Sequence, residues 1–308
     1  MAVSVKHVLE QGPAIRGMGE AALAVLKQRL GMGASGAAPH VPGPEITETF
    51  PPRSKELVRD YVRHVGGDPS SYRGRVPAHL FPQWGFALQG KTLEGLRYPL
   101  ARAMNGGCRL IQSAPLPDDE PLFVRANLES VDDDGRRAIL EQKIVTSTPS
   151  APDAVVAHLF VFVPLGGGKQ ENKNETRETR DKPRVDADAR EIAFWRLRAD
   201  AGLDFAKLTG DFNPVHWVPA YARAFGFKNT ILHGFGTMAR AIEGLNRALF
   251  AGDVDAWRQI EVRFTRPLVL PAKVGLYVKH EAGGVNRVWV GTAPGGPAFL
   301  QGTFQTSV

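Results

Sequence analysis

The sequence predicts an α+β protein built from two copies of one domain, each a long helix followed by antiparallel strands. The order of helices, turn and strands occurs twice in the 308 residues, which suffice for two domains with separate cores. A charged segment almost free of apolar residues, KQENKNETRETRDKPRVDADAR at 169–190, separates the two occurrences. The expected strands alternate apolar and polar residues, which is typical of a sheet with one buried face.

Three helices are expected in the second half. A short helix at Asp204–Leu208 should end at Gly210, and another at Pro219–Phe225 should end at Gly226, because glycine readily adopts the left-handed conformation at a helix end. A longer helix is predicted from Gly234 to about residue 250. Its apolar residues recur at helical spacing and are Met238, Ile242, Leu245 and Leu249.

Alternating strands follow this helix, and the first half repeats the same order. The alternating residues of the second half are Ile260, Val262 and Phe264; Val274, Leu276 and Val278; Val288 and Val290; and Leu300, Gly302 and Phe304. The elements expected in the first half are a helix at Val58–His64, a turn at Gly66–Pro69, a helix around Phe81–Leu88, and strands at Val124–Leu128, Ala138–Val145 and Val155–Val163. A repeat of about 120 residues is too long for a solenoid unit and indicates a duplicated domain that forms a pseudo-dimer.

The chain therefore divides into four segments. These are an N-terminal extension at 1–45, a first repeat at 46–168, a polar linker at 169–190 and a second repeat at 191–308. Within the extension we expect an amphipathic helix at Ala21–Leu30 and a Gly/Pro-rich connection at Gly31–Pro44.

Composition excludes several classes of protein. No run of about 18 apolar residues is present, so we expect no membrane span. The first residues lack an apolar core followed by a small-residue cleavage site, so we expect no secretory signal. The single cysteine, Cys108, excludes an internal disulfide framework and a multi-cysteine metal site. These observations fit a reducing compartment, and we expect a cytoplasmic protein.

The net charge of +6 and the pI near 9.5 favour acidic partners. Nucleic acid, a phosphorylated cofactor or an acidic carrier protein would each suit this charge. The basic residues are scattered, however, and aromatic residues do not interleave with them. We therefore expect no nucleic-acid binding and interpret the charge as a mildly basic solvated surface.

The loop Gly210–His216, GDFNPVH, is the strongest candidate site. Asp211 and His216 lie five positions apart, and Pro214 with the turn-forming Gly-Asp and Asn-Pro pairs prevents a regular helix. A curled loop can aim a carboxylate and an imidazole at one water, remove its proton and return a proton to a substrate. Taken alone, such a loop could equally be a turn held by its own side chains, with a solvated histidine.

The segment Ile231–Gly234, ILHG, favours the chemical interpretation. A glycine at the start of a helix lets a ligand approach the free backbone N–H groups. Those groups and the positive end of the helix would stabilise an oxyanion. A proton-transferring pair beside an oxyanion site predicts that an enolate forms or collapses next to a carbonyl group.

These residues resemble the MaoC-like (R)-specific enoyl-CoA hydratase/dehydratase family. The resemblance rests on LTGDFNPVH at 208–216, Ala222, Gly226-Phe227 and ILHG at 231–234. It implies a double hot-dog fold, in which each long helix is wrapped by a curved antiparallel sheet. It also implies catalytic roles for Asp211 and His216, which would activate the water that adds to C3 of a trans-2-enoyl thioester.

The resemblance assigns two further residues to substrate binding. Asn213 would help to hold the water or the loop, and the N–H of Gly234 would bind the thioester oxygen as an oxyanion site. His233, beside Gly234, is interpreted as structural. Arg223, Lys228 and Arg240 lie near enough in sequence to meet a CoA phosphate, although solvated charge is the simpler interpretation. Trp195 and Trp217 are expected to pack in the core or at its rim.

The first half departs from this pattern. Its turn, Gly67–Arg73, places Ser70 at the asparagine position and Arg73 at the histidine position when the two aspartates are aligned. Ala78-His79-Leu80 stands roughly where Leu232-His233-Gly234 stands, so the glycine of the helix start is lost. We therefore interpret the first half as a non-catalytic scaffold and acyl-binding wall, with one site per chain.

The predicted activity is hydration of (2E)-enoyl thioesters, linked to CoA or a carrier protein, to (3R)-3-hydroxyacyl thioesters, or the reverse dehydration. No metal, flavin or nicotinamide is predicted, and CoA or phosphopantetheine enters as part of the substrate. The expected partners are the acyl thioester, an acyl carrier protein and a second copy of the chain in a homodimer.

Three alternatives stay open. The first is a hydratase of a short branched or dicarboxylic acyl-CoA of the mesaconyl type. The second is a hot-dog thioesterase, although these enzymes typically lack this loop. The third is a non-catalytic acyl-thioester binding subunit, against which the intact Asp211–His216 pair argues.

Overall fold

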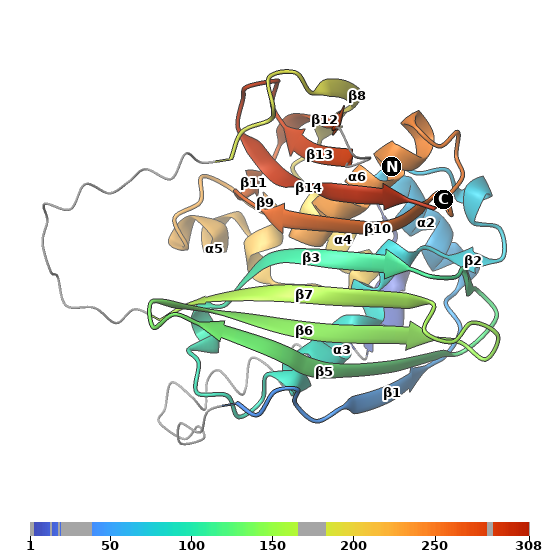
Figure 1. The fold of residues 1–308 in the computed structure, drawn as a ribbon, viewed down its shortest axis with the longest axis vertical. Helices are drawn as coiled ribbons and strands as arrows, with labels where there is room; N and C mark the ends of the chain where they lie inside the picture. The colour runs from blue at the N-terminus through green and yellow to red at the C-terminus, as the bar shows by residue number, and fades with distance from the viewer. Residues whose placement is uncertain are drawn as a thin grey trace, which may run out of the picture.

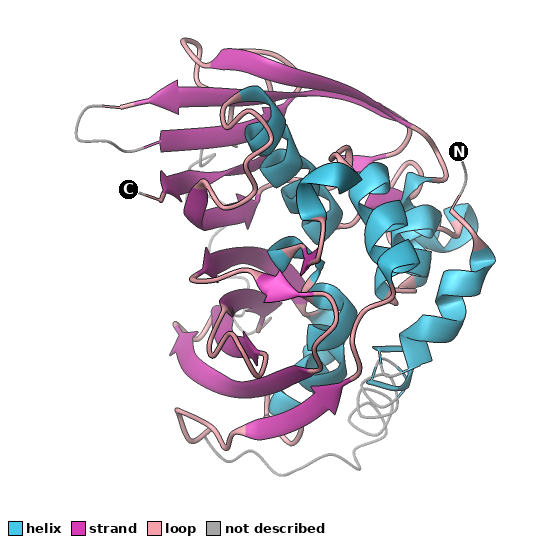
Figure 2. Cartoon of the chain, turned by 90° about the vertical axis from the view of Figure 1, so that its right-hand side faces the viewer, coloured by secondary structure: helices cyan, strands magenta, loops and turns pink. Residues whose placement is uncertain are grey.

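One curved antiparallel sheet of ten strands dominates the fold (Figure 1). The computed structural model describes residues 3–12, 14–17, 19, 39–165, 183–281 and 286–307. The strands run in the order β1-β5-β6-β7-β3-β10-β14-β13-β12-β8. The helices gather on one side of this sheet and leave its other side bare of helices (Figure 2).

The first half supplies the first five strands of that order. Its elements are η1 (Val5–Gln11), β1 (Ile46–Phe50), α2 (Lys55–Val65), η2 (Pro69–Tyr72), β2 (Arg75–Val76), η3 (Ala78–Leu80), α3 (Pro82–Thr92), η4 (Leu100–Arg102), β3 (Met104–Gln112), β4 (Leu116–Pro117), β5 (Leu122–Asp133), β6 (Arg137–Ser147) and β7 (Val155–Pro164), where η marks a 3-10 helix.

The second half supplies the other five. Its elements are β8 (Arg190–Leu197), α4 (Ala201–Thr209), η5 (Pro214–His216), α5 (Pro219–Ala224), β9 (Ile231–Leu232), α6 (Gly234–Ala248), β10 (Trp257–Phe264), β11 (Leu268–Val269), β12 (Ala272–His280), β13 (Asn286–Gly291) and β14 (Ala298–Thr306).

The pairing of β3 with β10 joins the halves into one sheet. Leu110 lies opposite Ile260, and Cys108 lies opposite Val262. A Cβ at Gly107 would come within 2.4 Å of the Val262 carbonyl oxygen, so the two strands approach closely where glycine stands. On either side of this pair the order β3-β7-β6-β5-β1 matches β10-β14-β13-β12-β8, and the predicted duplication is confirmed.

The core lies between the sheet and its helices. Met238, Ile242 and Leu245 of α6 are at most 1% exposed, which confirms the helical spacing that predicted this helix. A Cβ at Gly244 would lie 2.4 Å from the side chain of Leu276, so α6 rests directly on β12. Cys108 is fully buried in β3, and burial raises the pKa of its thiol well above the ordinary value, so it is not a nucleophile.

All the helices and strands predicted in the described residues are present, with shifted ends. The sequence analysis did not predict β1, β3, β8 or η1, nor the short elements β2, β4, β9, β11, η2, η3, η4 and η5. The predicted helix at Ala21–Leu30 lies outside the described residues, as do 31–38 of the predicted connection and 169–182 of the predicted linker. No described helix is long and apolar enough to cross a membrane.

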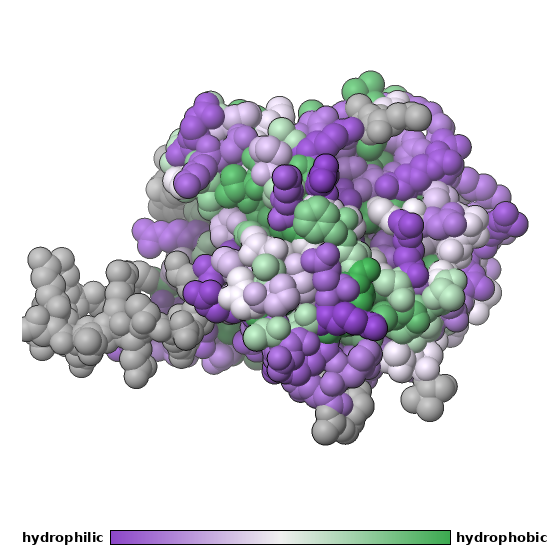
Figure 3. Space-filling model, turned by 90° about the horizontal axis from the view of Figure 1, so that it is seen from above, coloured by the Kyte–Doolittle hydropathy of each residue, from purple (hydrophilic) through white to green (hydrophobic). Residues whose placement is uncertain are grey.

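The last residues of the predicted linker are packed. Val185 and Ala189 are buried in a cluster with Tyr277 and Trp289, and β8 already begins at Arg190. The predicted linker therefore extends too far at its C-terminal end, because residues 185–190 belong to the packed second half. The surface above the second half mixes hydrophilic side chains with smaller apolar patches (Figure 3).

Replacing Gly107 by alanine tests the contact between the halves. Because the new Cβ would meet the Val262 carbonyl, we expect Gly107→Ala to lower the free energy of unfolding by about 1–3 kcal/mol. Gly12→Ala, where nothing lies within 4 Å of the added Cβ, should change it by less than about 0.5 kcal/mol. Urea titration followed by circular dichroism measures both. Equal stability of the two variants would contradict the close approach of β3 and β10.

Candidate active site

The loop between α4 and α5 is held by its own side chains. Gly210 ends α4 in the left-handed conformation, at φ +81°. The Asn213 side-chain oxygen caps η5 by accepting a hydrogen bond from Val215 N at 3.2 Å. Asp211 Oδ1 accepts from Asn213 N at 3.3 Å. Asn213, itself exposed, therefore orders the loop through its side-chain oxygen.

One ring nitrogen of His216 forms a hydrogen bond with the backbone, and the other can accept one from a ligand. Its Nδ1 lies 2.8 Å from the Ile231 carbonyl oxygen, and since a carbonyl only accepts, Nδ1 carries the proton. Nε2 is then an unprotonated acceptor, as a general base requires. A Cβ at Gly202 would lie 2.1 Å from the His216 carbonyl oxygen, so α4 passes directly against η5 and fixes its position.

His233 supports both members of the predicted pair. Its ring stacks on His216 with 3.6 Å between centroids, and its Nε2 donates to the Asp211 carbonyl oxygen at 3.0 Å. The side chain is 1% exposed. Burial, with a smaller contribution from His216, lowers the pKa of His233 to about 3. The ring therefore stays neutral near pH 7 and contacts the pair without adding charge, which fits its predicted structural role.

Asp211, His216 and His233 converge on one point. Each has a nitrogen or carboxylate oxygen within 4.8 Å of the others', and the Asp211 side chain is 21% exposed. Such a spacing suits one water shared by Asp211 and His216, because each hydrogen bond spans about 2.7–3.0 Å. The same three residues fit a metal ion poorly. The His233 nitrogen nearest the carboxylate, 3.8 Å from Oδ2, already donates its proton to a carbonyl.

Gly234 places free N–H groups beside this pair. It is the first residue of α6, and the N–H groups of a first helical turn have no partners within the helix. A Cβ at Gly234 would lie 2.7 Å from the Phe264 ring, so any side chain would displace that ring and cover the backbone. The predicted oxyanion role of Gly234 stays a prediction.

The N-terminal segment supports the helix that leads into the loop. Gln11, fully buried, donates from Nε2 to the carbonyl oxygens of Lys207 and Leu208 at 3.2 Å each. The Ala14 Cβ lies 2.6 Å from where a Cβ at Gly210 would stand. No signal in the sequence points to these contacts, because an isolated glutamine outside the repeat has no pattern that marks it.

The first-half turn is one residue shorter than its counterpart. Gly66, like Gly210, is left-handed at a helix end, and Asp68 caps η2 as Asn213 caps η5. Asp68 therefore corresponds to Asn213, and Gly67 stands nearest the Asp211 position. The sequence comparison, which matched Asp68 to Asp211, was wrong because it assumed turns of equal length. The first half has lost the carboxylate as well as the histidine.

The helix start of the first half is also shifted from its predicted place. Val76 pairs with Leu116 as Leu232 pairs with Leu268, so Ala78 corresponds to Gly234. The expectation that Leu80 takes this place was wrong by two residues, because η3 adds a turn before α3.

A closed polar network occupies this part of the first half. His79 Nε2 lies 3.1 Å from Glu243 Oε1 of α6, and both side chains are at most 2% exposed. The Tyr61 hydroxyl donates to the His79 carbonyl oxygen at 2.8 Å. A Cβ at Gly67 would lie 2.4 Å from the Glu243 carboxylate. Protein groups thus fill the space that a substrate would need.

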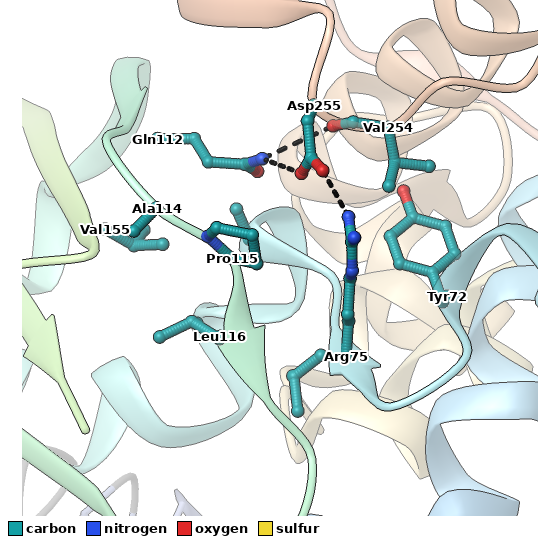
Figure 4. A pocket seen from close by; sticks show the side chains of 11 residues that line it. Tyr72, Arg75, Gln112, Ala114, Pro115, Leu116, Val155, Val254 and Asp255 are labelled. Carbon is teal, nitrogen blue, oxygen red and sulfur yellow. Dashed lines mark hydrogen bonds and ion pairs between the residues drawn. The ribbon is translucent and has the colours of Figure 1, made fainter. Parts of the chain in front are cut away.

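A small cavity lies beside this network (Figure 4). Its volume is about 10 Å³, which is room for about one water. Asp255 reaches into its wall from the second half, pairs with Arg75 and accepts a hydrogen bond from Gln112 Nε2 at 3.1 Å. The cavity is too small for an acyl thioester.

The remaining candidates differ in exposure. Trp195 is half-buried and Arg240 is largely buried, with its Nη2 3.5 Å from His64 Nε2. Desolvation lowers the pKa of Arg240 to about 10. Arg223 and Lys228 are exposed, as is Trp217.

Comparison with known proteins adds family evidence. Residues 172–292 match the family model described as a MaoC like domain. The chain is 26% identical over 188 residues to enoyl-CoA hydratase 2, peroxisomal, of Arabidopsis thaliana, and the match covers 58% of this chain and 60% of that protein. It is 26% identical over 276 residues to 3-hydroxyacyl-thioester dehydratase X of Mycobacterium tuberculosis, with 86% of this chain and 92% of that protein covered.

Solved structures share the fold. The crystal structure of HtdX of Mycobacterium tuberculosis has a TM-score of 0.66 and 22% identity, and the match covers 86% of this chain and all of that one. A second protein of that organism, described as having a double hotdog fold, has a TM-score of 0.54 at 13% identity, with 87% of this chain and 97% of that one covered. The predicted double hot-dog fold is confirmed.

Replacing Gln11 by methionine tests whether the N-terminal segment supports the loop. Gln11→Met keeps the volume and removes the donor that bonds the carbonyl groups of His7, Lys207 and Leu208. We expect the free energy of unfolding to fall by about 1–3 kcal/mol. Leu9→Ala, on the same segment but 87% exposed, is the matched control and should change it little. Thermal and urea unfolding measure the stability of both variants. An effect of Gln11→Met no larger than that of Leu9→Ala would contradict the prediction that the N-terminal segment supports the loop.

The depressed pKa of His233 makes stability depend on pH. The ring binds its proton near pH 6.5 when the chain is unfolded and near pH 3 when it is folded. The neutral ring of His233 therefore makes its full contribution to the free energy of unfolding above about pH 6.5. This contribution is lost as pH falls toward 3, by up to about 1.4 kcal/mol per pH unit. In His233→Gln this part of the pH dependence should vanish. Urea midpoints of both proteins between pH 4 and 7 measure the difference, and parallel curves would show that His233 does not titrate this way.

Proposed function

We propose, from the premise that the second half of this chain is a MaoC-like domain, that the protein is a hydro-lyase acting on acyl thioesters. It hydrates (2E)-enoyl thioesters to (3R)-3-hydroxyacyl thioesters, or runs the reverse dehydration. The observation that carries this proposal is the His216 ring. Its Nδ1 is bound to the Ile231 carbonyl oxygen, and its ring lies within reach of the Asp211 carboxylate.

The pair activates one water. His216 Nε2 and the Asp211 carboxylate accept its two hydrogen bonds and orient the oxygen toward C3 of the enoyl group. As the new C–O bond forms, one of these groups takes the proton of the water. That proton is then delivered to C2, so that the elements of water add across the double bond. The dehydration follows the same path in reverse.

The start of α6 stabilises the intermediate. When the oxygen adds to C3, electrons move through the double bond to the thioester oxygen, which becomes an enolate. The Gly234 N–H and the positive end of α6, which begins at Gly234, would bind this oxygen. Donors fixed by a helix need no reorganisation as the charge develops, so they lower the barrier rather than only binding the substrate.

The reaction has simple chemical requirements. A proton and a water move, no electrons are gained or lost, and the described residues supply both proton carriers. The CoA or phosphopantetheine group belongs to the substrate.

We further propose that the protein works in a reducing compartment such as the cytoplasm. We also propose that it forms a homodimer, which light scattering would measure.

Enoyl-thioester absorbance tests the proposal. Wild type should consume crotonyl-CoA or a longer enoyl-CoA, whereas Asp211→Asn and His216→Ala should lose about 10²–10⁴-fold in kcat, because each removes one of the groups that move the proton. Asp68→Ala, at the cap of the closed first half, is the matched control and should keep most of the activity.

Three outcomes would count against the proposal. Full activity in Asp211→Asn or His216→Ala would contradict the mechanism. An equal loss in Asp68→Ala would place a second site in the first half. No turnover by wild type at any chain length would favour a non-catalytic binding subunit.

A further inference from the structure

A largely buried arginine lies where α6 packs against α2 and β8. The Nε of Arg240, on α6, is buried and has no hydrogen-bond partner. Its Nη2 lies 3.5 Å from His64 Nε2 on α2, and Arg240 forms no ion pair in the described part of the chain. Removing a charge from water is costly unless an opposite charge compensates it. An arginine of this kind is suited to an anion from outside the chain.

The groups around Arg240 supply no negative charge. Desolvation lowers the pKa of Arg240 to about 10, and Tyr61 is the group that acts in the opposite direction. Tyr61 is uncharged at neutral pH, because burial raises the pKa of its hydroxyl further above the ordinary value. Desolvation, followed by the charge of Arg240, lowers the pKa of His64 well below its usual value. The guanidinium therefore lies beside a neutral imidazole and a neutral phenol.

An indole N–H faces open space beside the same residues. Trp195 of β8 covers Gly244, which lies one turn after Arg240 on α6, and a Cβ at Gly244 would come within 3.2 Å of the indole ring. Apart from the adjacent residues of the chain, the one described atom within 4 Å of a Cβ added at Gly66 would be Trp195 Nε1, 3.8 Å away. This Nε1 forms no hydrogen bond within the described residues. A free donor thus borders an open volume at the end of α2.

The negative end of α2 offsets only part of the positive charge. Arg247 follows Arg240 and Gly244 on one face of α6, at a spacing of four and then three residues. It is exposed and donates from Nη1 to the Gly66 carbonyl oxygen at 3.0 Å. A helix end carries about half an elementary charge, so two guanidinium groups leave an excess of positive charge here. The planar fork of arginine matches the oxygens of a phosphate.

We propose that a small tetrahedral anion, phosphate or sulfate, binds at the α2–α6 junction, defined by His64, Gly66, Trp195, Arg240 and Arg247. The two guanidinium groups and the indole N–H donate hydrogen bonds to its oxygens. His64 and Gly66 belong to the first half of the chain, and the other three residues belong to the second. A bound anion therefore stabilises the contact between the halves.

The junction is separate from the catalytic loop. The path from His64 to the loop runs through the fully buried ring of Phe205. Its centroid lies 6.3 Å from that of His64 and 4.8 Å from that of His233, and His233 in turn stacks on His216. The inference therefore goes beyond the proposed function and does not depend on it.

Thermal unfolding in phosphate tests the site. At an ionic strength held constant with sodium chloride, phosphate at roughly ten times its Kd should raise the Tm of the wild type by about 2–4 °C, and sulfate should do the same. Arg240→Met should abolish this rise. Arg247→Gln, at an exposed position that tolerates replacement, should weaken phosphate binding about tenfold in calorimetry. Arg196→Gln is the matched control and should keep the full rise, because Arg196 is exposed and follows Trp195 on β8, so it points to the opposite face of the strand.

Three results would overturn the site. The first is an equal rise in Tm in Arg240→Met, or unchanged phosphate affinity in Arg247→Gln. The second is the same rise in the wild type when chloride replaces phosphate at equal ionic strength, which would show screening rather than binding. The third is competition between phosphate and CoA in calorimetry, which would make Arg240 part of the substrate site.

Discussion

The antiparallel pairing of β3 with β10 turns two halves into one continuous sheet, and the helices of each half then lie over a shared core. Because of this pairing, Glu243 of the second half reaches His79 of the first, and Asp255 reaches Arg75. Neither half has a complete interior alone. The site in the second half therefore depends on packing that the first half completes, although no first-half residue supplies its proton-transferring groups.

Equivalent positions in the two halves differ in what packs against them. In the second half, Gly234 stands where a Cβ would come within 2.7 Å of the Phe264 ring. In the first half, the turn is one residue shorter, Gly67 meets the Glu243 carboxylate, and the space is filled by protein. The buried contact between His79 and Glu243 occupies this place in the first half.

The sequence predicted the long elements well, because α6 and β7 repeat their apolar residues at one clear period. The loop Gly210–His216 has a dense motif, and its catalytic role stays a prediction. β3 was missed because Asn105-Gly106-Gly107 breaks its alternation, and the glycine that hides the strand is required by its neighbour β10. The alignment of the two turns failed because the first-half turn is one residue shorter. The position of that deletion is visible only once Asp68 and Asn213 are known to cap η2 and η5. The buried position of Gln11 depends on contacts with a distant segment, which no local pattern records.

The N-terminal segment has a consequence for synthesis. Val3 N bonds to Asp204 Oδ1 across 201 positions, and Gln11 bonds to Leu208 across 197. At about 5–20 residues per second, a ribosome adds α4 roughly 10–40 s after the first residues have emerged. During that time the buried faces of His7, Gln11 and Ala14 have no α4 to cover them. The segment that contacts the start of the loop is thus made about 200 residues before the helix that covers it.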